Sequence, residues 1–331
     1  FAGWTPEVAD KVTGNAVYTA QWTANEDTKY TVEYYYQSET DGTYPATADE
    51  RSERQGTTAA TVTVTAKDKT PSRAGYVFDE TNVSNVLSGT IAGNGSTVLK
   101  VYFKKQFTVS YEPGDHGTFD KQTTSGLDYG TTTPEFDGTP AGEEGYTFGG
   151  WTPAVAETVT TDVSYVAQWT ANEDTKYTVE YYYQTNGTYG AAESPVTRSG
   201  RTDTKVQVTA KDKEPSKTGY VFDTAAANVL EGTISGKGDL VLKVYFKEQF
   251  SVTYAPGSQG TFTSQTTGSL DYNAATPGFN GTPTGNAGYT FAGWTPEVAD
   301  KVTGNAVYTA QWTANEDTKY TVEYYYQSET D

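Results

Sequence analysis

The acidic segments that recur along the chain are the first residues whose types could bind a ligand. Each contains an Asn-Glu-Asp run, at residues 25–27, 172–174 and 315–317. Carboxylate and amide oxygens are the ligands that Ca²⁺ prefers. Asn172, Glu173 and Asp174 are therefore candidate calcium ligands, although the spacing of an EF-hand loop is absent. A solvated polar linker is the favoured interpretation, and it requires neither a metal nor another cofactor.

Two tyrosines at equivalent places, Tyr35 and Tyr182, are candidate ligand-binding residues. Each lies in a Thr-Val-Glu-Tyr-Tyr-Tyr run whose alternation predicts a β-strand. In the first of these strands, the face opposite Tyr35 carries Tyr30, Val32, Tyr34 and Tyr36. An exposed tyrosine can stack on a sugar or a peptide. A cross-strand aromatic contact, or a contact between repeats, is the favoured alternative.

The sequence contains few residues of the types that perform catalysis. The chain has no cysteine, and its one histidine, His116, is matched by Gln259 in an equivalent repeat. Carboxylates such as Glu112 and Glu135 become Ala255 and Gly278 in the same comparison. A carboxylate pair that performs acid–base catalysis could not be lost so freely. No phosphate-binding loop, nucleophile elbow or His-Glu-x-x-His motif occurs, so we expect no enzyme and no catalytic residue.

Composition and charge exclude further classes of function. The 331 residues contain 23 Lys and Arg against 42 Asp and Glu, which gives a formal net charge of −19. Nucleic-acid binders carry a basic surface, so this balance argues against a nucleic-acid partner. It also argues against an anionic membrane surface. No apolar run is long enough to span a bilayer, so we expect no membrane insertion in this segment.

Two kinds of repeat alternate along the chain, and residues 1–41 recur unchanged at 291–331. We name the first kind A1 and A2 and the second kind B1 and B2. The predicted modules are A1 (30–106), B1 (107–169), A2 (177–249) and B2 (250–312), with linkers at 23–29, 170–176 and 313–319. No linker separates A from B, so the A-to-B joint should be the tighter one. Residues 1–22 match the C-terminal part of a truncated B repeat, and residues 320–331 match the first strand of a truncated A repeat. Ends that fall inside a repeat suggest that these residues are part of a longer array of repeats.

The repeats read as small, mainly β modules of an α+β, β-grasp-like kind. Alternation places Leu99, Val101 and Phe103 on one side of a strand. Residues 79–88 are less β-like and are predicted as one short helix, and Pro153 is predicted at the start of a helical turn. Large aromatic residues shared by the repeats are predicted to pack in the core or between modules rather than to bind ligands. This structural set is Trp151, Trp169, Trp294, Trp312, Tyr146 and Phe148.

Two family resemblances follow from these motifs. Gly145-Tyr-Thr-Phe-Gly-Gly-Trp, followed by a segment from Thr160 that ends in Ala-Gln-Trp at Trp169, resembles the Listeria–Bacteroides repeat, also called the internalin B-repeat. The A units, with Tyr-Thr-Val-Glu-Tyr-Tyr-Tyr, Gly-Tyr-Val-Phe-Asp and a closing Leu-Lys-Val-Tyr-Phe, resemble the MucBP (mucin-binding protein) repeat. Both resemblances imply β-grasp-like modules, arranged in tandem in bacterial surface proteins.

The expected function is that of stalk or spacer repeats in a cell-surface adhesin or fibrous surface protein. An elongated, beads-on-a-string array would project a distal functional domain, with neighbouring repeats of the same longer chain as partners. The expected location is extracellular, on the bacterial (Gram-positive) cell surface, with anchoring in the cell wall. Two alternatives stay open. The A units could bind host mucin or other glycans multivalently, or the chain could self-associate as a subunit of a surface fibre.

Overall fold

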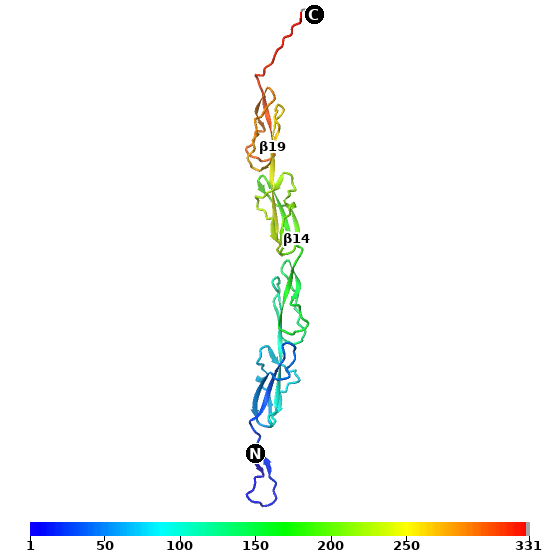
Figure 1. The fold of residues 1–331 in the computed structure, drawn as a ribbon, viewed down its shortest axis with the longest axis vertical. Coiled ribbons are helices and arrows are strands. Elements are labelled where there is room, and N and C mark those ends of the chain that lie inside the picture. Colours follow the sequence, from blue (N-terminus) through cyan, green and yellow to red (C-terminus); the bar gives the residue numbers. More distant parts are fainter. Residues whose placement is uncertain (329–331) are drawn as a thin grey trace. The chain divides into compact units, whose positions relative to one another are not determined.

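The computed structural model describes residues 1–328, and strands dominate it (Figure 1). The helical elements of this part of the chain are two 3₁₀ turns, η1 (Lys67–Lys69) and η2 (Lys211–Lys213). The chain forms two compact units. The first contains residues 1–143 and 147–170, and the second contains residues 144–146 and the chain from 171 onward. The mainly β fold class expected for the repeats is confirmed.

A1 is a mixed sheet with a parallel pair at its centre. Its strands are β3 (Thr28–Tyr36), β4 (Glu50–Gly56), β6 (Tyr76–Phe78) and β8 (Val98–Glu112). β3 and β8 run parallel, β4 pairs antiparallel with β3, and β6 pairs antiparallel with β8. A separate small hairpin joins β5 (Thr61–Thr63) to β7 (Ser88–Thr90).

The predicted faces of these strands are confirmed. Val32, Leu99, Val101 and Phe103 are fully buried together, and Tyr30, Tyr34 and Tyr36 pack in the same cluster. Successive side chains of a strand point to opposite sides of the sheet. The alternating apolar residues of these strands therefore lie together on one face.

B1 repeats the same plan with a different core. Its strands are the second half of β8, β9 (Gln122–Asp128), β10 (Tyr146–Thr152) and β11 (Val163–Ala171). β11 runs parallel to β8, whereas β9 pairs with it antiparallel. The strand order is therefore β9-β8-β11-β10. A central parallel pair with antiparallel neighbours is therefore common to A1 and B1.

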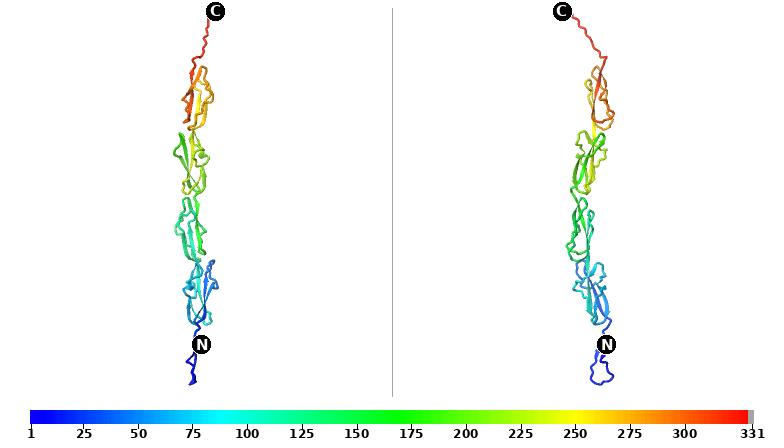
Figure 2. Two further views of the ribbon diagram at one scale, coloured as in Figure 1. Left: turned by 90° about the vertical axis from the view of Figure 1, so that its left-hand side faces the viewer. Right: turned by 180° about the vertical axis from the view of Figure 1, so that it is seen from behind.

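The second unit repeats this arrangement with one added two-residue strand, β13, and Figure 2 gives further views of the chain. β12 runs parallel to β18, which runs parallel to β21. The strands are β12 (Thr175–Thr185), β13 (Thr188–Tyr189), β14 (Glu193–Gly200), β15 (Lys205–Gln207), β16 (Tyr220–Phe222), β17 (Glu231–Thr233), β18 (Val241–Ala255), β19 (Gln265–Asp271), β20 (Tyr289–Thr295) and β21 (Ala306–Ala314).

The two short helices predicted from the sequence are wrong. Residues 79–88 form turns and the start of β7. Asp79 accepts hydrogen bonds from the backbone and hydroxyl of Thr81 (3.2 and 2.8 Å), and Asn85 bonds to the Asp79 carbonyl (2.8 Å) and to the Tyr102 N–H (3.0 Å). Asp and Asn side chains that bond to the backbone compete with a helix in this way. Pro153 follows β10 in a bend rather than a helical turn.

The two incomplete repeats form little regular structure. In residues 1–22, β1 (Gly3–Thr5) pairs with β2 (Thr19–Gln21). Residues 320–328, which match the first strand of an A repeat in sequence, form no strand, and no partner strand lies beside them in the described part of the chain. The rest of that match, 329–331, lies outside the described residues. No helix within residues 1–328 is long and apolar enough to cross a membrane.

Candidate functional site

The joint between A and B is a single strand that serves two sheets. β8 is 15 residues long. Its residues 98–103 pair with β3, and its residues 109–112 pair with β11. A1 and B1 therefore belong to one seven-stranded sheet. β18, also 15 residues long, joins A2 to B2 in the same way. From the direct step between Gln106 and Phe107, the sequence predicted only that this joint is the tighter one. The shared strand is a finding of the structure. The predicted looseness of the linkers stays a prediction.

Side chains also cross the A-to-B joint. The Lys104 Nζ lies 2.5 Å from the Asp128 carboxylate, and the Tyr129 hydroxyl donates to the Thr40 carbonyl at 3.2 Å. The Tyr129 ring lies directly on Gly42, where an added Cβ would stand only 2.3 Å from a ring carbon. This contact explains a glycine at that position.

The second copy reproduces two of these contacts. Lys247 pairs with Asp271 at 2.7 Å, and the Tyr272 ring lies on Gly187. The joint is therefore the same built contact in both units.

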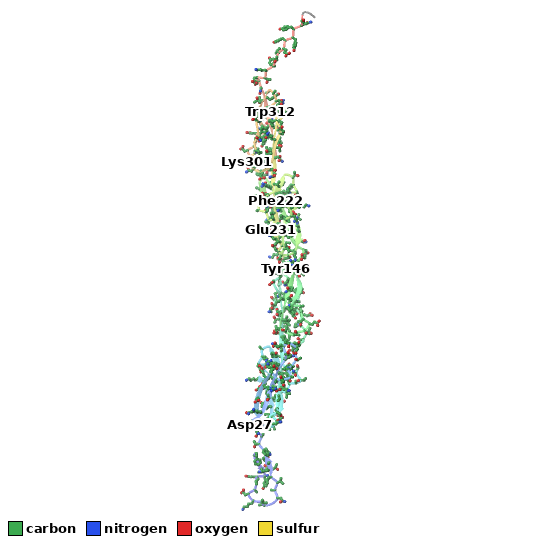
Figure 3. The ribbon with its side chains drawn as sticks, viewed as in Figure 1. Asp27, Tyr146, Phe222, Glu231, Lys301 and Trp312 are labelled. Carbon is green, nitrogen blue, oxygen red and sulfur yellow. The ribbon has the colours of Figure 1, made fainter. Side chains whose placement is uncertain are left out.

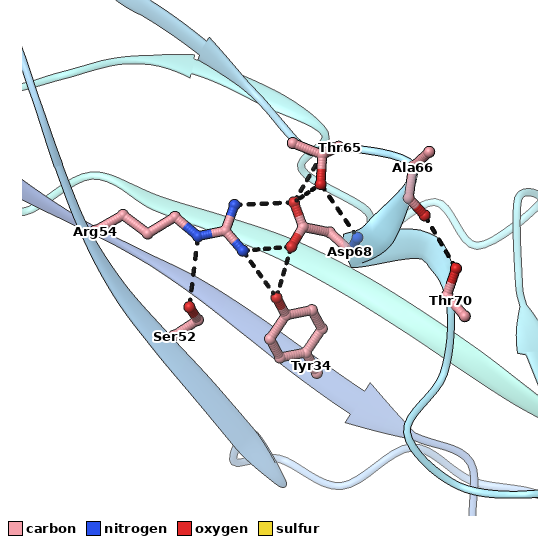
Figure 4. A network of polar contacts seen from close by, with 7 residues as sticks. All are labelled: Tyr34, Ser52, Arg54, Thr65, Ala66, Asp68 and Thr70. Carbon is pink, nitrogen blue, oxygen red and sulfur yellow. Dashed lines mark hydrogen bonds and ion pairs between the residues drawn. The ribbon is translucent and has the colours of Figure 1, made fainter.

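A buried carboxylate, Asp68, is the centre of the densest polar network in A1 (Figure 4). Asp68 is 3% exposed. The Arg54 guanidinium binds both carboxylate oxygens, one of them at 2.9 Å. The Tyr34 hydroxyl donates at 2.8 Å, and the Thr65 N–H and hydroxyl donate at 2.7 and 2.9 Å. The network therefore joins β3, β4 and the 3₁₀ turn η1.

The electrostatics of this network favour a structural role. Hydrogen bonding to Arg54 holds the pKa of the Asp68 carboxyl well below its ordinary value. Burial, followed by the hydrogen bond to Asp68, raises the pKa of Tyr34 to about 12. A carboxylate that is ionised and accepts bonds from Arg54, Tyr34 and Thr65 is a poor proton acceptor at neutral pH. The arrangement can hold a turn against a sheet.

A2 contains the same network around Asp212, which is 4% exposed and binds Arg198, Tyr181 and Thr209. A hollow of about 490 Å³ lies beside it. Several of the polar groups that line the hollow are paired with each other, as Lys217 is with Glu193 at 2.6 Å and Arg198 is with Asp212 at 2.9 Å. A ligand would have to displace these pairs.

Sequence reasoning missed this network. A signal was present, because Val-Thr-Ala-Lys-Asp-Lys occurs both at 64–69 and at 208–213. In this run a Thr precedes an Asp by three residues, and the Asp returns to bond with the Thr backbone at the start of the turn. The arginine partner is 14 residues away on another strand, and local patterns do not reach that far.

The proposed ligand-binding role of Tyr35 is contradicted by its burial. Tyr35 is 4% exposed and stacks on Tyr102 with ring centroids 4.5 Å apart. Tyr44 meets Tyr102 edge-on at 5.1 Å, so the loop after β3 covers this face of the sheet. The cross-strand contact, which was the favoured alternative, is the one observed.

Tyr182 occupies the equivalent place in A2 and is half-buried. It stacks on Tyr245 at 4.5 Å, and its hydroxyl donates to Glu180 at 2.5 Å. Its ring is thus also held in a cross-strand pair, which leaves the glycan alternative without an open tyrosine platform at these two positions.

The tyrosine network predicts alkaline sensitivity of the A modules. Burial raises the pKa of Tyr35 to about 12, and the hydrogen bond to Glu180 does the same for Tyr182. These phenols hold their protons more tightly when folded, so their contribution to stability is complete below pH 10 and is lost as pH rises from about 10 to about 12. We expect tyrosinate absorbance and loss of near-ultraviolet circular dichroism to rise together in that range. The control is the variant Tyr35→Phe with Tyr182→Phe, in which the change of absorbance between pH 10 and pH 12 should be smaller than in the native chain. A change of the same size in both proteins would contradict this expectation.

The Asn-Glu-Asp linkers use their backbone rather than a cluster of carboxylates. The Asn172 N–H donates to the Gly145 carbonyl at 2.8 Å, and its carbonyl accepts from Thr202 at 2.9 Å. Glu173 pairs with Arg201 at 3.1 Å, and Asp174 is exposed. Within residues 1–328, no group of three or more His, Cys, Asp or Glu side chains is placed to hold a metal ion. The calcium prediction therefore gains no support from the geometry.

The aromatic residues of the B modules pack as the sequence predicted. Trp151 lies edge-on to Tyr111 at 4.8 Å, and the Trp169 indole donates to the Pro113 carbonyl at 2.6 Å. Phe148 lies between the two tryptophans, 5.2 Å from one and 5.6 Å from the other.

B2 shows the same arrangement. Trp294 packs on Tyr254, and Phe291 contacts both tryptophans of the module. Trp312, which is labelled in Figure 3, donates to the Pro256 carbonyl at 2.8 Å. The remaining member of the predicted set, Tyr146, bonds through its hydroxyl to Asp203. His116 lies in a turn, 3.4 Å from Glu143.

Comparisons with known proteins add little to this geometry. No family model matches the chain, and no curated protein matches it. A crystal structure of Mub-RV is similar at 14% sequence identity over 65% of this chain and 97% of that chain, with a TM-score of 0.16. A likeness at that TM-score has no bearing on the function of this chain.

Proposed function

We propose that this chain is a set of stalk repeats in a bacterial surface protein, and that each A·B pair is one rigid segment of the stalk. The observation that carries the proposal is the 15-residue strand shared by the two sheets of each pair. A spacer must resist bending within its segments, and a strand that continues from sheet to sheet has no free hinge.

The physical argument concerns the hydrogen bonds on both sides of the joint. β8 is held by β3 and β6 before Gln106 and by β9 and β11 after it. Bending the strand at Gln106 would break ladder bonds in A1, in B1 or in both, and each bond left unmade costs about 1–3 kcal/mol when buried. The Lys104–Asp128 pair and the contact of Tyr129 with Gly42 add to this resistance.

The polar groups of the modules support the same conclusion. Asp68 and Asp212 are engaged on all sides by neighbouring donors, and the candidate tyrosines are held in ring pairs. These features stabilise the modules, and none of them favours glycan binding over the spacer role.

The spacer proposal predicts that length grows in equal steps with the number of A·B pairs. Deleting residues 30–176 removes one pair with its linker and joins Lys29 to Tyr177, which restores the native Thr-Lys-Tyr-Thr sequence. We expect the maximum dimension measured by small-angle X-ray scattering to fall by one fixed step, and to rise by the same step when a pair is added.

The matched control replaces the deleted pair by a Gly/Ser linker of about 150 residues, whose end-to-end distance is roughly 60–75 Å and grows only as the square root of length. If each added pair contributes less than the one before, as in that control, the spacer proposal is wrong.

A further inference from the structure

The order of parallel strands in each unit defines a path for tension. In A1 the first and last strands, β3 and β8, are neighbours and parallel, with six residue pairs from Thr31↔Val98 to Tyr36↔Phe103. In B1 the entering and leaving strands, β8 and β11, are also neighbours and parallel, with four pairs from Val163↔Val109 to Val166↔Glu112. The second unit has six and four pairs in the same places.

Tension on such a unit loads its ladders in shear. The chain enters at the N-terminal end of β3 and leaves at the C-terminal end of β11. A pull on these two ends draws β3 and β8 in opposite directions along their length, and then does the same to β8 and β11. In this direction the bonds of a ladder must yield together, whereas a hairpin pulled apart at its open end loses one bond at a time.

The connecting segments lie outside this path. Residues 37–97 of A1 and 113–162 of B1 leave one path strand and return to the next, so they carry no tension while the ladders hold. Side chains reinforce the start of the shorter ladder. The Thr108 N–H donates to Asp162 at 2.7 Å, and in B2 the Ser251 N–H donates to Asn305 at 2.8 Å.

We propose that each A·B pair is a tension-bearing element in which two parallel-strand clamps act in series along one shared strand. In the first unit the clamps are β3·β8 and β8·β11, which share β8. In the second unit they are β12·β18 and β18·β21, which share β18. The four-pair clamp of B yields before the six-pair clamp of A. This inference rests on the proposed spacer function and gives it a mechanical role, namely to keep its length under load.

Single-molecule stretching of the full chain tests the order of rupture. With handles added at both ends, we expect two B events at lower force, each releasing roughly 60 residues or about 200 Å of chain, followed by two A events that each release roughly 75 residues or about 250 Å. Rupture of the longer segments first would overturn the proposed hierarchy.

Pulling geometry tests the shear mechanism itself. The chain has no cysteine, so handles can be attached at introduced cysteines. Lys29→Cys with Gln106→Cys loads β3 against β8 in shear. Lys29→Cys with Gln55→Cys separates β3 from β4 at the end of an antiparallel ladder, because Lys29 and Gln55 are partners there. The Lys29 and Gln55 side chains are exposed, so neither Lys29→Cys nor Gln55→Cys should impair folding.

We expect rupture at several-fold higher force in the first geometry than in the second. Equal forces in the two geometries would overturn the clamp proposal. The scattering experiment is done without load, so fixed length steps with weak rupture would refute the clamps and leave the spacer proposal standing. Steps that shrink with each added pair would refute the spacer, whatever the rupture force.

Discussion

Replacing Asp68 and Asp212 by alanine together is expected to lower the free energy of unfolding of the A modules by about 3–5 kcal/mol each. Each carboxylate is buried and binds an arginine, a tyrosine hydroxyl and a threonine backbone N–H. Its removal leaves a partly buried guanidinium without its partner and buried donors without an acceptor, which costs far more than the loss of an exposed pair.

The position of tryptophan makes this experiment specific for the A modules. All six tryptophans lie in B1, B2 and residues 1–22, so their fluorescence reports B, and tyrosine circular dichroism reports mainly A. We expect the tyrosine signal to change at lower denaturant in the double variant. Lys29→Ala is the control, because it removes only the exposed Lys29–Glu53 pair and should cost less than about 1 kcal/mol. A double variant as stable as this control would show that the buried network contributes nothing.

Phe103→Ala with Phe246→Ala is expected to lower the stability of the A modules by about 3–5 kcal/mol each, through lost burial and the cavity left behind. Both rings are fully buried, and each stacks on a tyrosine, Tyr36 or Tyr183, at 4.9 Å. Val83→Ala is the control, because Val83 is 100% exposed and its truncation should change stability by less than about 0.5 kcal/mol.

The same phenylalanine variant also tests coupling between A and B. Phe103 lies in β8, whose second half is a central strand of B1. We therefore expect the tryptophan transition of the B modules to move to lower denaturant as well, by a smaller amount than the tyrosine transition. A tryptophan transition that stays in place would show that A and B unfold independently in spite of the shared strand.

The sequence was most informative where covalent geometry alone decides the outcome. Alternation along Tyr30–Tyr36 and along Val98–Phe103 placed the apolar side chains on one face, because neighbouring residues of a strand point in opposite directions. The direct step from Gln106 to Phe107 predicted a tight joint for a similar reason, since no linker residue separates the two modules. The structure adds that one strand crosses this joint. The recurrence of large aromatic residues at equivalent positions of the B modules predicted their packing, because such rings bury a large apolar area.

Only the tertiary structure decided the burial of Tyr35, the pairing of Asp68 and the conformation of residues 79–88. Tyr35 lies on the face that alternation marks as outer, and it is buried because Tyr44 and its loop cover that face. Asp68 sits in a polar run that reads as solvated, and it became an internal ion because Arg54 reaches it from a different strand. Residues 79–88 form turns rather than a helix because the side chains of Asp79 and Asn85 bond to backbone groups, one of which lies on β8. In each case the deciding contact is made by a loop or strand outside the local alternation. Periodicity records only which way a side chain points, not what will cover it.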